Sequence, residues 1–376
     1  MDRRAFLGTV TGLLAAPLAA QAQRGAKTWR VGFLSGGGRP PDGAPPLPLR
    51  QALQELGYLE QQNVIYLSRW AEAKQDRLRG LATELVGLNV DVIVTAGGPA
   101  SAAAKQATSS IPIVLAIVGD ADGLGLIESL ARPGGNVTGV TDQSGELSAK
   151  RLEILKEAVP KAAHIAVLWN ADDRGMTLRY RAVEKAAQML RVTVQPLGVR
   201  EPDDFDVAFS AMTLHRPDAL FLVTDALTLL NRKRVIDFAL AHRIPAMYEF
   251  NFLVQDGGLM SYGASQDDNY RRAASYVDRI FKGATPSALP VERPSRYYLT
   301  INLKTAKVLG LTIPPSLLQR ADQMIERRLR LTGSGAWRGT HQSARWPGML
   351  SKGLRGSDTH DGDPLGFEPR KHLRPA

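Results

Sequence analysis

Short apolar runs that alternate with helical stripes are the feature that most constrains how this chain can fold. Such runs occur at 29–34, 64–69, 90–95 and 111–118. Between them, apolar residues recur at i, i+3, i+4 and i+7, as in the segment 49–56, which is the spacing of an amphipathic helix. Strands that form unbroken apolar runs are typical of parallel sheets covered on both faces. The alternation therefore predicts an α/β fold.

A glycine- and proline-rich stretch from Arg132 to Thr141 interrupts this alternation. Its proline and paired glycines end the preceding segment, and Gly139 lies within a β-branched run, where a glycine marks a bulge, a bend or a close backbone approach. We interpret the stretch as the point where one α/β lobe passes into another, with Gly139, Val140 and Thr141 as a hinge. An ordinary tight turn inside a single sheet fits the same pattern equally well.

Chain length and a second alternation after this stretch favour two lobes. A chain of 376 residues exceeds what one core of ordinary size serves. Segments at 257–263 and 286–294 are interpreted as the second and third crossings between the lobes. The predicted N-terminal lobe comprises residues 28–139 and 257–285, and the predicted C-terminal lobe comprises residues 141–250 and 290–326.

The first 22 residues have the pattern of a signal peptide. Arg3 and Arg4 precede an apolar run at 7–18, and a small-x-small sequence ends at Ala22. A run of about a dozen residues is too short to span a membrane, which needs roughly 20. We expect cleavage near Ala22 and a periplasmic protein. The paired arginines resemble a twin-arginine signal, and the general secretory route fits as well.

Cysteine content and charge exclude several kinds of site. Without cysteine there is no disulfide, no thiolate nucleophile or metal ligand, and no lipid anchor on a cysteine after the signal. Residues 327–376 contribute +6 of the net charge of +10 and the first 22 residues contribute +1, so the body carries +3 and no nucleic-acid partner is expected. The segment 327–376 is rich in Gly, Arg, Ser and Pro and is predicted to be disordered.

Hydroxyls and glycines follow two strands of the first lobe, and ligands collect at the carboxyl ends of parallel strands. The hydroxyls of Ser35 and Thr95 are expected to bind a ligand carboxylate. The amides of Gly97 and Gly98, at the start of a helix, are expected to be free for the same group.

Acidic and aromatic residues complete the predicted site. Asp120 or Asp225 is expected to pair with an ammonium or amide group, and Tyr248 and Tyr262 to close over the apolar part of a ligand. The full set of candidate ligand-binding residues is Ser35, Gly36, Thr95, Gly97, Gly98, Asp120, Asn170, Asp225, Tyr248 and Tyr262. Structural roles also fit some of them: a loop cap for Ser35, caps of a helix at 124–130 for Asp120 and Asp122, a core position for Tyr248, and packing for Tyr262.

Binding without chemistry is the mechanism that this pattern favours. The six histidines include no His-x-x-x-His pair, and the chain has neither a Gly-x-Ser-x-Gly nor a Ser-x-x-Lys motif. We therefore expect no catalytic residue, no metal and no cofactor. Two other classes stay open: an exported α/β enzyme, because the fold hosts many catalysts, and an input module that reports a ligand to a signalling partner.

Five phrases of the sequence together resemble one protein family. They are Gln51–Tyr58, Arg132–Val140, Lys150–Glu153, Gly257–Gly263 and Ile301–Ala306. On these phrases the chain, from Val31 to about Glu326, is similar to the ABC-transporter substrate-binding proteins of the family that includes the tryptophan and tyrosine transporter binding proteins.

This resemblance implies a type I periplasmic-binding fold with two Rossmann-like lobes and three hinge crossings. It further implies a small, amino-acid-like ligand that is captured as the lobes close. An ABC permease in the inner membrane with its ATPase is the implied partner, and we expect a monomer.

Deletion of residues 327–376 is expected to leave the protein's stability nearly unchanged, because the segment has no apolar stripe with which to join the core. Thermal unfolding of the full and the shortened chain measures this. A melting temperature lower by several degrees in the shortened chain would contradict the prediction of a disordered segment.

Overall fold

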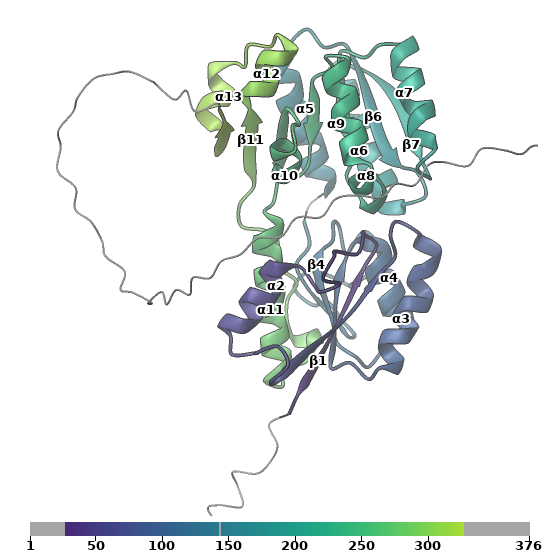
Figure 1. Ribbon diagram of the computed structural model, residues 1–376, viewed down its shortest axis with the longest axis vertical. Helices are drawn as coiled ribbons and strands as arrows, with labels where there is room; N and C mark the ends of the chain where they lie inside the picture. Colours follow the sequence, from purple (N-terminus) through teal and green to yellow (C-terminus); the bar gives the residue numbers. More distant parts are fainter. Residues whose placement is uncertain (1–26, 143, 327–376) are drawn as a thin grey trace, which may run out of the picture. The chain divides into compact units, whose positions relative to one another are not determined.

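The computed structural model describes residues 27–142 and 144–326. The predicted signal peptide and the predicted disordered segment lie outside the described residues. None of the helices in the described ranges has the length and apolar character that crossing a bilayer requires. The described residues form two α/β lobes, whose helices and strands are labelled in Figure 1.

Five parallel strands form the sheet of the N-terminal lobe, in the order β2-β1-β3-β4-β5. The strands are β1 (Trp29–Ser35), β2 (Val64–Trp70), β3 (Val92–Ala96), β4 (Ile113–Ile117) and β5 (Val137–Gly139). This is one of the doubly wound strand orders, in which the carboxyl ends of the strands line a crevice. The four strands predicted from apolar runs are confirmed, with ends that differ by a few residues.

Helices cover both faces of this sheet (Figure 1). On one face, α2 (Leu47–Glu55) and α11 (Gln266–Phe281) share a buried cluster with Val31 and Phe33 of β1. On the other face, α3 (Leu78–Gly87) and α4 (Gly98–Ala107) share a cluster with Leu34 of the same strand. Since successive side chains of a strand point to opposite faces, a strand covered on both faces is apolar at consecutive positions.

The C-terminal lobe is built on seven strands in the order β12-β11-β10-β9-β8-β6-β7. The strands are β6 (His164–Asn170), β7 (Thr193–Val199), β8 (Ala219–Leu222), β9 (Ala246–Tyr248), β10 (Met260–Gly263), β11 (Tyr298–Asn302) and β12 (Gln323–Ile325). Neighbouring strands are parallel except for the antiparallel pair β10 and β11.

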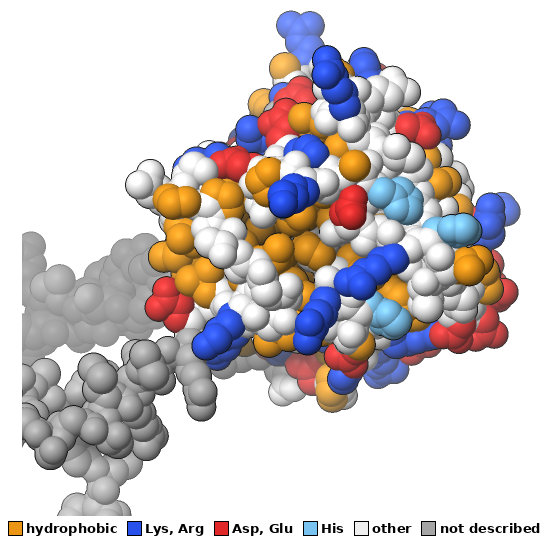
Figure 2. Space-filling view, turned by 90° about the horizontal axis from the view of Figure 1, so that it is seen from above, with side chains coloured by type: hydrophobic (Ala, Val, Ile, Leu, Met, Phe, Trp, Pro, Cys, Tyr) orange, Lys and Arg blue, Asp and Glu red, His pale blue; other side chains and the backbone are white. Residues whose placement is uncertain are grey.

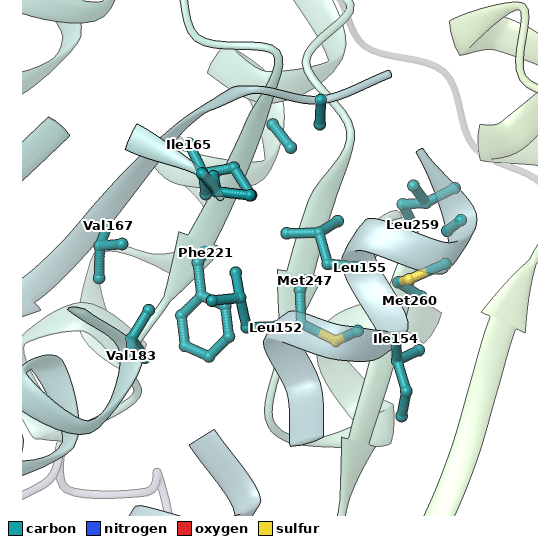
Figure 3. Packing of buried hydrophobic residues seen from close by; sticks show 14 of the residues in the cluster. Leu152, Ile154, Leu155, Ile165, Val167, Val183, Phe221, Met247, Leu259 and Met260 are labelled. Atoms are coloured by element: carbon teal, nitrogen blue, oxygen red, sulfur yellow. The ribbon is translucent and has the colours of Figure 1, made fainter. Parts of the chain in front are cut away.

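The core of this lobe also lies on both faces of its sheet. One face is covered by α5 (Ser144–Ala158), α6 (Arg174–Met189), α12 (Leu303–Leu309) and α13 (Pro315–Arg320). The other is covered by α7 (Asp204–Leu214), α8 (Ala226–Leu230), α9 (Arg232–Ala241) and α10 (Asn251–Gln255). Figure 3 shows the first cluster, in which Val167 of β6 and Phe221 of β8 lie near Val183 of α6. Burial of each such side chain contributes about 1.5–3 kcal/mol.

The outer surface carries single exposed apolar side chains. Met189, Val207, Leu214 and Val308 are at least 60% exposed. On the face shown in Figure 2, charged side chains of both signs surround an area where apolar side chains gather. Apolar side chains exposed singly are normal on protein surfaces.

Backbone hydrogen bonds join the first and third connections between the lobes. The amide of Thr141 donates to the carbonyl of Glu292, and the amide of Glu292 donates to the carbonyl of Gly139, each at 2.9 Å. The amide of Val140 donates to Leu115 of β4 at 2.8 Å. The predicted hinge residues Gly139, Val140 and Thr141 therefore lie in a block that is hydrogen-bonded to the N-terminal lobe.

The predicted lobe boundaries need two corrections. The segment 257–263, assigned to the N-terminal lobe, contains β10, which pairs with β9 and β11 of the C-terminal sheet. Conversely, Val291 at the start of the predicted segment 290–326 is buried in a cluster of the N-terminal lobe. β10 is a short strand between glycines, and its sequence does not indicate which sheet it joins. The next helix, α11, lies in the N-terminal lobe as predicted.

The helix expected at 124–130 does not form. Residues 121–125 make successive turns instead, and Gly125 has a φ of +73°. A glycine with positive φ ends a helix. Asp120 and Asp122 therefore cap no helix there, which removes the structural role that the sequence offered for both and favoured for Asp122.

Gly139→Ala is expected to lower the free energy of unfolding by about 3 kcal/mol or more. Gly139 has a φ of +126°, and a Cβ atom there would lie 2.3 Å from the carbonyl oxygen of Leu115. Gly135→Ala is the control, since Gly135 also has positive φ (+56°) but no atom within 4 Å of an added Cβ. Urea unfolding compares the two, and equal losses would show that the contact with Leu115 is unimportant.

Candidate functional site

A cavity of about 260 Å³ lies between the two lobes. Residues after β1, β3 and β4 line it from the N-terminal lobe, and residues after β6, β8 and β9 line it from the C-terminal lobe. Every one of these positions follows the carboxyl end of a strand, where the doubly wound arrangement concentrates loops and helix starts. The cavity is therefore the site that the strand order of the sheets predicts.

The start of α4 supplies backbone donors on the N-terminal side. Within the described residues, the amides of Gly98 and Ala100 donate to no acceptor, as expected for the first turn of a helix. The amide of Gly97, predicted to be free, donates instead to the carbonyl of Ile117 at 2.7 Å. The amide of Gly98 is therefore free as predicted, that of Gly97 is not, and Ala100 supplies a further free donor.

Three aromatic rings border the cavity. Trp70 at the end of β2 and Tyr270 of α11 line it from the N-terminal lobe, and Phe250 lines it from the C-terminal lobe. Phe33 supports the first two from beneath, with ring centroids 5.0 Å from Trp70 and 6.4 Å from Tyr270. Within the described residues, the buried indole nitrogen of Trp70 has no hydrogen-bond partner. The rings give the cavity an apolar part.

Two aspartates stand at helix starts on the C-terminal side. Asp173 caps α6, where its Oδ1 accepts from the amides of Gly175 at 2.7 Å and Met176 at 3.3 Å. Asp225 caps α8, where its Oδ1 accepts from the amide of Thr228 at 2.9 Å. A carboxylate is a preferred N-cap because it satisfies amides that the helix leaves without a partner.

The local environment raises the pKa of both aspartates. Burial raises the pKa of Asp225 despite its hydrogen bonds. Burial also raises the pKa of Asp173, and the nearby Asp225 carboxylate adds to that effect. Asn170 donates to Oδ2 of Asp225 at 2.6 Å. Two carboxyl groups thus share a buried wall in which the ionised form is disfavoured.

Arg179 of α6 also lines the cavity and is held by acidic groups. Its Nη1 lies 2.9 Å from both carboxylate oxygens of Glu249, and its Nη2 lies 3.7 Å from Oδ1 of Asp142. Arg151 of α5 approaches Glu249 at 3.2 Å and donates through Nε to the carbonyl of Tyr262 at 2.5 Å. The guanidinium of Arg179 is therefore occupied by the protein's own carboxylates.

The pKa values of this group reflect strong mutual attraction. Burial alone would raise the pKa of Glu249, but the charges of Arg151 and Arg179 outweigh burial and hold it below its ordinary value. Burial likewise opposes the charge of Arg179, whose pKa is nevertheless raised by Glu249 and Asp142. Both partners stay ionised, which is the condition for a buried ion pair to hold.

Six of the ten predicted ligand-binding residues line the cavity: Ser35, Gly36, Gly97, Gly98, Asn170 and Asp225. Within this set, the hydroxyl of Ser35 accepts from the amide of Gly37 at 3.0 Å, so it also caps its loop. The contact of these residues with a ligand stays a prediction.

The other four predicted residues lie elsewhere. Thr95 is fully buried, and its hydroxyl is 2.7 Å from that of Ser101. Asp120 borders a smaller neighbouring cavity of about 20 Å³. Tyr248 is 1% exposed within the core of the C-terminal lobe, and Tyr262 packs against the other core cluster. Thr95, Tyr248 and Tyr262 lie near strand ends as expected, but side chains at alternate positions of a strand point into the core.

Sequence reasoning missed the residues that give the cavity its charge and its rings. They are Trp70, Asp142, Asp173, Arg179, Glu249, Phe250 and Tyr270. A signal was present for Asp173, since an aspartate before a helix after a strand is an N-cap at a strand's carboxyl end. Among the described residues, no group of three or more His, Cys, Asp or Glu side chains is arranged to hold a metal ion.

Two doubly wound lobes with a cavity between their strand ends define a two-lobed ligand-binding protein. The sequence model of the family described as ABC transporter substrate binding protein matches residues 48–325. The chain therefore belongs to the ABC-transporter substrate-binding proteins, and the resemblance found in the sequence is confirmed, as is the type I periplasmic-binding fold.

Relatives and solved structures agree with this assignment. The tyrosine-binding protein of Clostridioides difficile (strain R20291) is 27% identical over 262 residues, which are 69% of this chain and 75% of that protein. A domain from Streptococcus pneumoniae, solved in complex with L-Trp, has a TM-score of 0.73 at 26% identity, covering 80% of this chain and all of that one. A conserved domain protein from Vibrio cholerae has a TM-score of 0.74 at 27% identity, covering 79% and 100%.

Arg179→Gln is expected to lower the free energy of unfolding by about 3–5 kcal/mol, because it leaves Glu249 buried with only Arg151 to offset its charge. Arg181→Gln is the control, since Arg181 is exposed on the same helix. Urea unfolding of both variants without added ligand measures the difference. A loss below about 0.5 kcal/mol in both would contradict a stabilising role for the pair.

Proposed function

We propose that this chain is the exported component of an ABC importer that captures an amino acid with an aromatic side chain. The observation that carries the proposal is the composition of the cavity, which combines free helix-start amides, acidic side chains and three rings. These three kinds of group match a carboxylate, an ammonium and an aromatic side chain.

The amides of Gly98 and Ala100 fit the carboxylate of such a ligand. A helix start offers free N–H groups and a positive potential, so it favours an anion. A hydrogen bond to a charged group contributes about 1.5–3 kcal/mol. Since Arg179 is occupied by Glu249 and Asp142, the backbone is the stronger candidate for this group.

The rings of Trp70, Phe250 and Tyr270 fit the aromatic side chain. Offset or edge-on contacts between rings add about 0.5–1.5 kcal/mol beyond the burial of area. A volume of about 260 Å³ is just below the ~300–1,000 Å³ typical of small-molecule sites, so the cavity has the size for one small solute. Tyrosine and L-Trp in the names of two relatives point to the same class of ligand.

Contacts between the lobes at the cavity's edge support a capture mechanism. A Cβ atom on Gly36 would lie 3.4 Å from the Cβ of Ala226, and one on Gly38 would lie 2.8 Å from Leu230. With the walls this close, a ligand enters only when the lobes separate. A ligand that touches both lobes then stabilises the closed state by its difference in affinity for the two states.

Export and partners complete the proposal. The signal-peptide pattern that ends near Ala22 supports a periplasmic location, and the family supports delivery of the ligand to a permease with its ATPase. We place the bending between the lobes around 264–265 and at 293–297, outside the hydrogen-bonded pairing of Gly139 and Thr141 with Glu292.

A thermal-shift screen of the full chain against the twenty amino acids tests this function. Tryptophan or tyrosine is expected to give the largest rise in melting temperature, because a ligand at 100 times its dissociation constant adds about 2.7 kcal/mol. Lysine and glutamate, which bring charge without a ring, are the controls. Stabilisation by an apolar aliphatic amino acid alone, or by none of the twenty, would contradict an aromatic ligand.

A further inference from the structure

We propose that Asn269 and Tyr270 of α11 bind a neutral polar group on the ring of the ligand. The cavity then takes an aromatic amino acid whose ring carries an O–H or N–H group in preference to one whose ring is wholly apolar. This inference rests on the proposed function and deepens it, because it assigns the choice among aromatic side chains to two residues.

The side-chain amide of Asn269 is not used by the protein. The residue lines the cavity and is 8% exposed, and its carboxamide has no hydrogen-bond partner among the described residues. Its polar atoms nevertheless keep accessible surface, whereas the indole nitrogen of Trp70 and the hydroxyl of Thr224 are enclosed by the protein. The carboxamide is therefore open to a molecule in the cavity.

The position of Asn269 within α11 gives the amide no structural role. The helix is capped by Ser265, whose side chain accepts from the amide of Asp268, so Asn269 is not the cap. Inside a helix, asparagine is less favourable than alanine or leucine. Buried polar groups are also almost always paired. Since the fold gains nothing from an amide here, its use lies in what the cavity binds.

Tyr270 adds a second neutral polar group on the same helix face. It lines the cavity and is 8% exposed, and its hydroxyl also lacks a partner among the described residues while keeping accessible surface. Burial raises the pKa of Tyr270 and the charge of Asp267 adds to this effect, so the hydroxyl keeps its proton. Gln266, one turn earlier, lines the cavity as well.

These groups lie with the rings of the cavity and not with its charges. Tyr270 is itself one of the three rings, and Phe33 supports both Tyr270 and Trp70. The residues of α11 that line the cavity are all uncharged. The charged lining residues come from the first connection and from the C-terminal lobe: Asp142, Asp173, Arg179, Asp225 and Glu249. The aromatic side chain of the ligand is therefore the part that meets α11.

A carboxamide and a protonated phenol suit a neutral O–H or N–H group. Each of them can both donate and accept, so together they can bind a ring hydroxyl or accept from an indole N–H. A wholly apolar ring would cover Asn269 and Tyr270 without replacing their bonds to water. A site whose polar groups are left unpaired in this way discriminates strongly against the ligand that lacks the polar group.

Two pairs of amino acids of matched shape test the proposal by calorimetry on the full chain. In 4-methylphenylalanine a methyl group replaces the hydroxyl of tyrosine, and in benzothienylalanine sulfur replaces the indole N–H of tryptophan. In the pair whose natural member binds more tightly, we expect that member to exceed its partner by about tenfold or more. A smaller difference or the reverse order would overturn the inference and keep the proposed function, whereas binding of none of the four would overturn both.

Asn269→Leu and Tyr270→Phe remove the polar atoms and nearly keep the size of the side chains. Each is expected to narrow the ratio within that pair to about threefold or less, by weakening the natural amino acid and not its partner. Ser275→Leu is the control, because Ser275 is exposed on the same helix and does not line the cavity. A ratio that stays unchanged in both variants would overturn the inference.

The melting temperature of the ligand-free Asn269→Leu protein separates recognition from a structural role. Leucine has the higher helix propensity and brings no polar group into the buried position. The melting temperature is therefore expected to stay unchanged or to rise. A lower melting temperature together with equal weakening of all four compounds would mean that Asn269 only supports the fold, and the inference would fall.

Discussion

The buried ion group around Glu249 is the interaction on which the rest of the structure depends. Arg151 of α5 and Arg179 of α6 approach this carboxylate from two helices, and Arg151 also holds the end of β10 through the carbonyl of Tyr262. Arg179 reaches Asp142, the last described residue before the chain continues into α5. A buried ion pair is weak evidence for net stability, but it fixes geometry strictly because each charge requires its partner. Through these contacts the group joins a residue of the cavity wall, Arg179, to Asp142 near the first connection and to the end of β10 before the second.

The fold was largely predictable because its signals are local and repeated. Unbroken apolar runs such as 90–95 form strands wherever both faces are covered, and helical stripes such as that at 49–56 form the covering helices. Of the bulge, bend or close backbone approach that Gly139 indicated, the contact that a Cβ atom would make with Leu115 shows the close approach. The position of the site followed from the same rule, since strand ends converge regardless of which residues stand there, and Ser35 and Asp225 both reach the cavity.

The chemistry of the site was harder to predict because it arises from pairs that are distant in the sequence. Nothing local distinguishes Arg179, in the middle of a helix, from exposed arginines such as Arg181, and only the approach of Glu249 from another element gives it a role. Tyr248 was misplaced because one residue of register decides whether a side chain at the end of a strand faces the core or the cavity. The amide of Gly97 was predicted to be free, but it donates to the carbonyl of Ile117 before the helix begins.

The hydrogen bonds that tie Thr141 and Gly139 to Glu292 limit how this molecule can move. Two of the three covalent tethers leave the N-terminal lobe as a bonded pair and cannot slide past one another without breaking those bonds. If the lobes open as proposed, these bonds favour a rotation over a sliding motion. Such a rotation would widen the cavity least beside the connections and most at the opposite edge, so the thickness of a solute near the connections and its length away from them would decide whether it can enter.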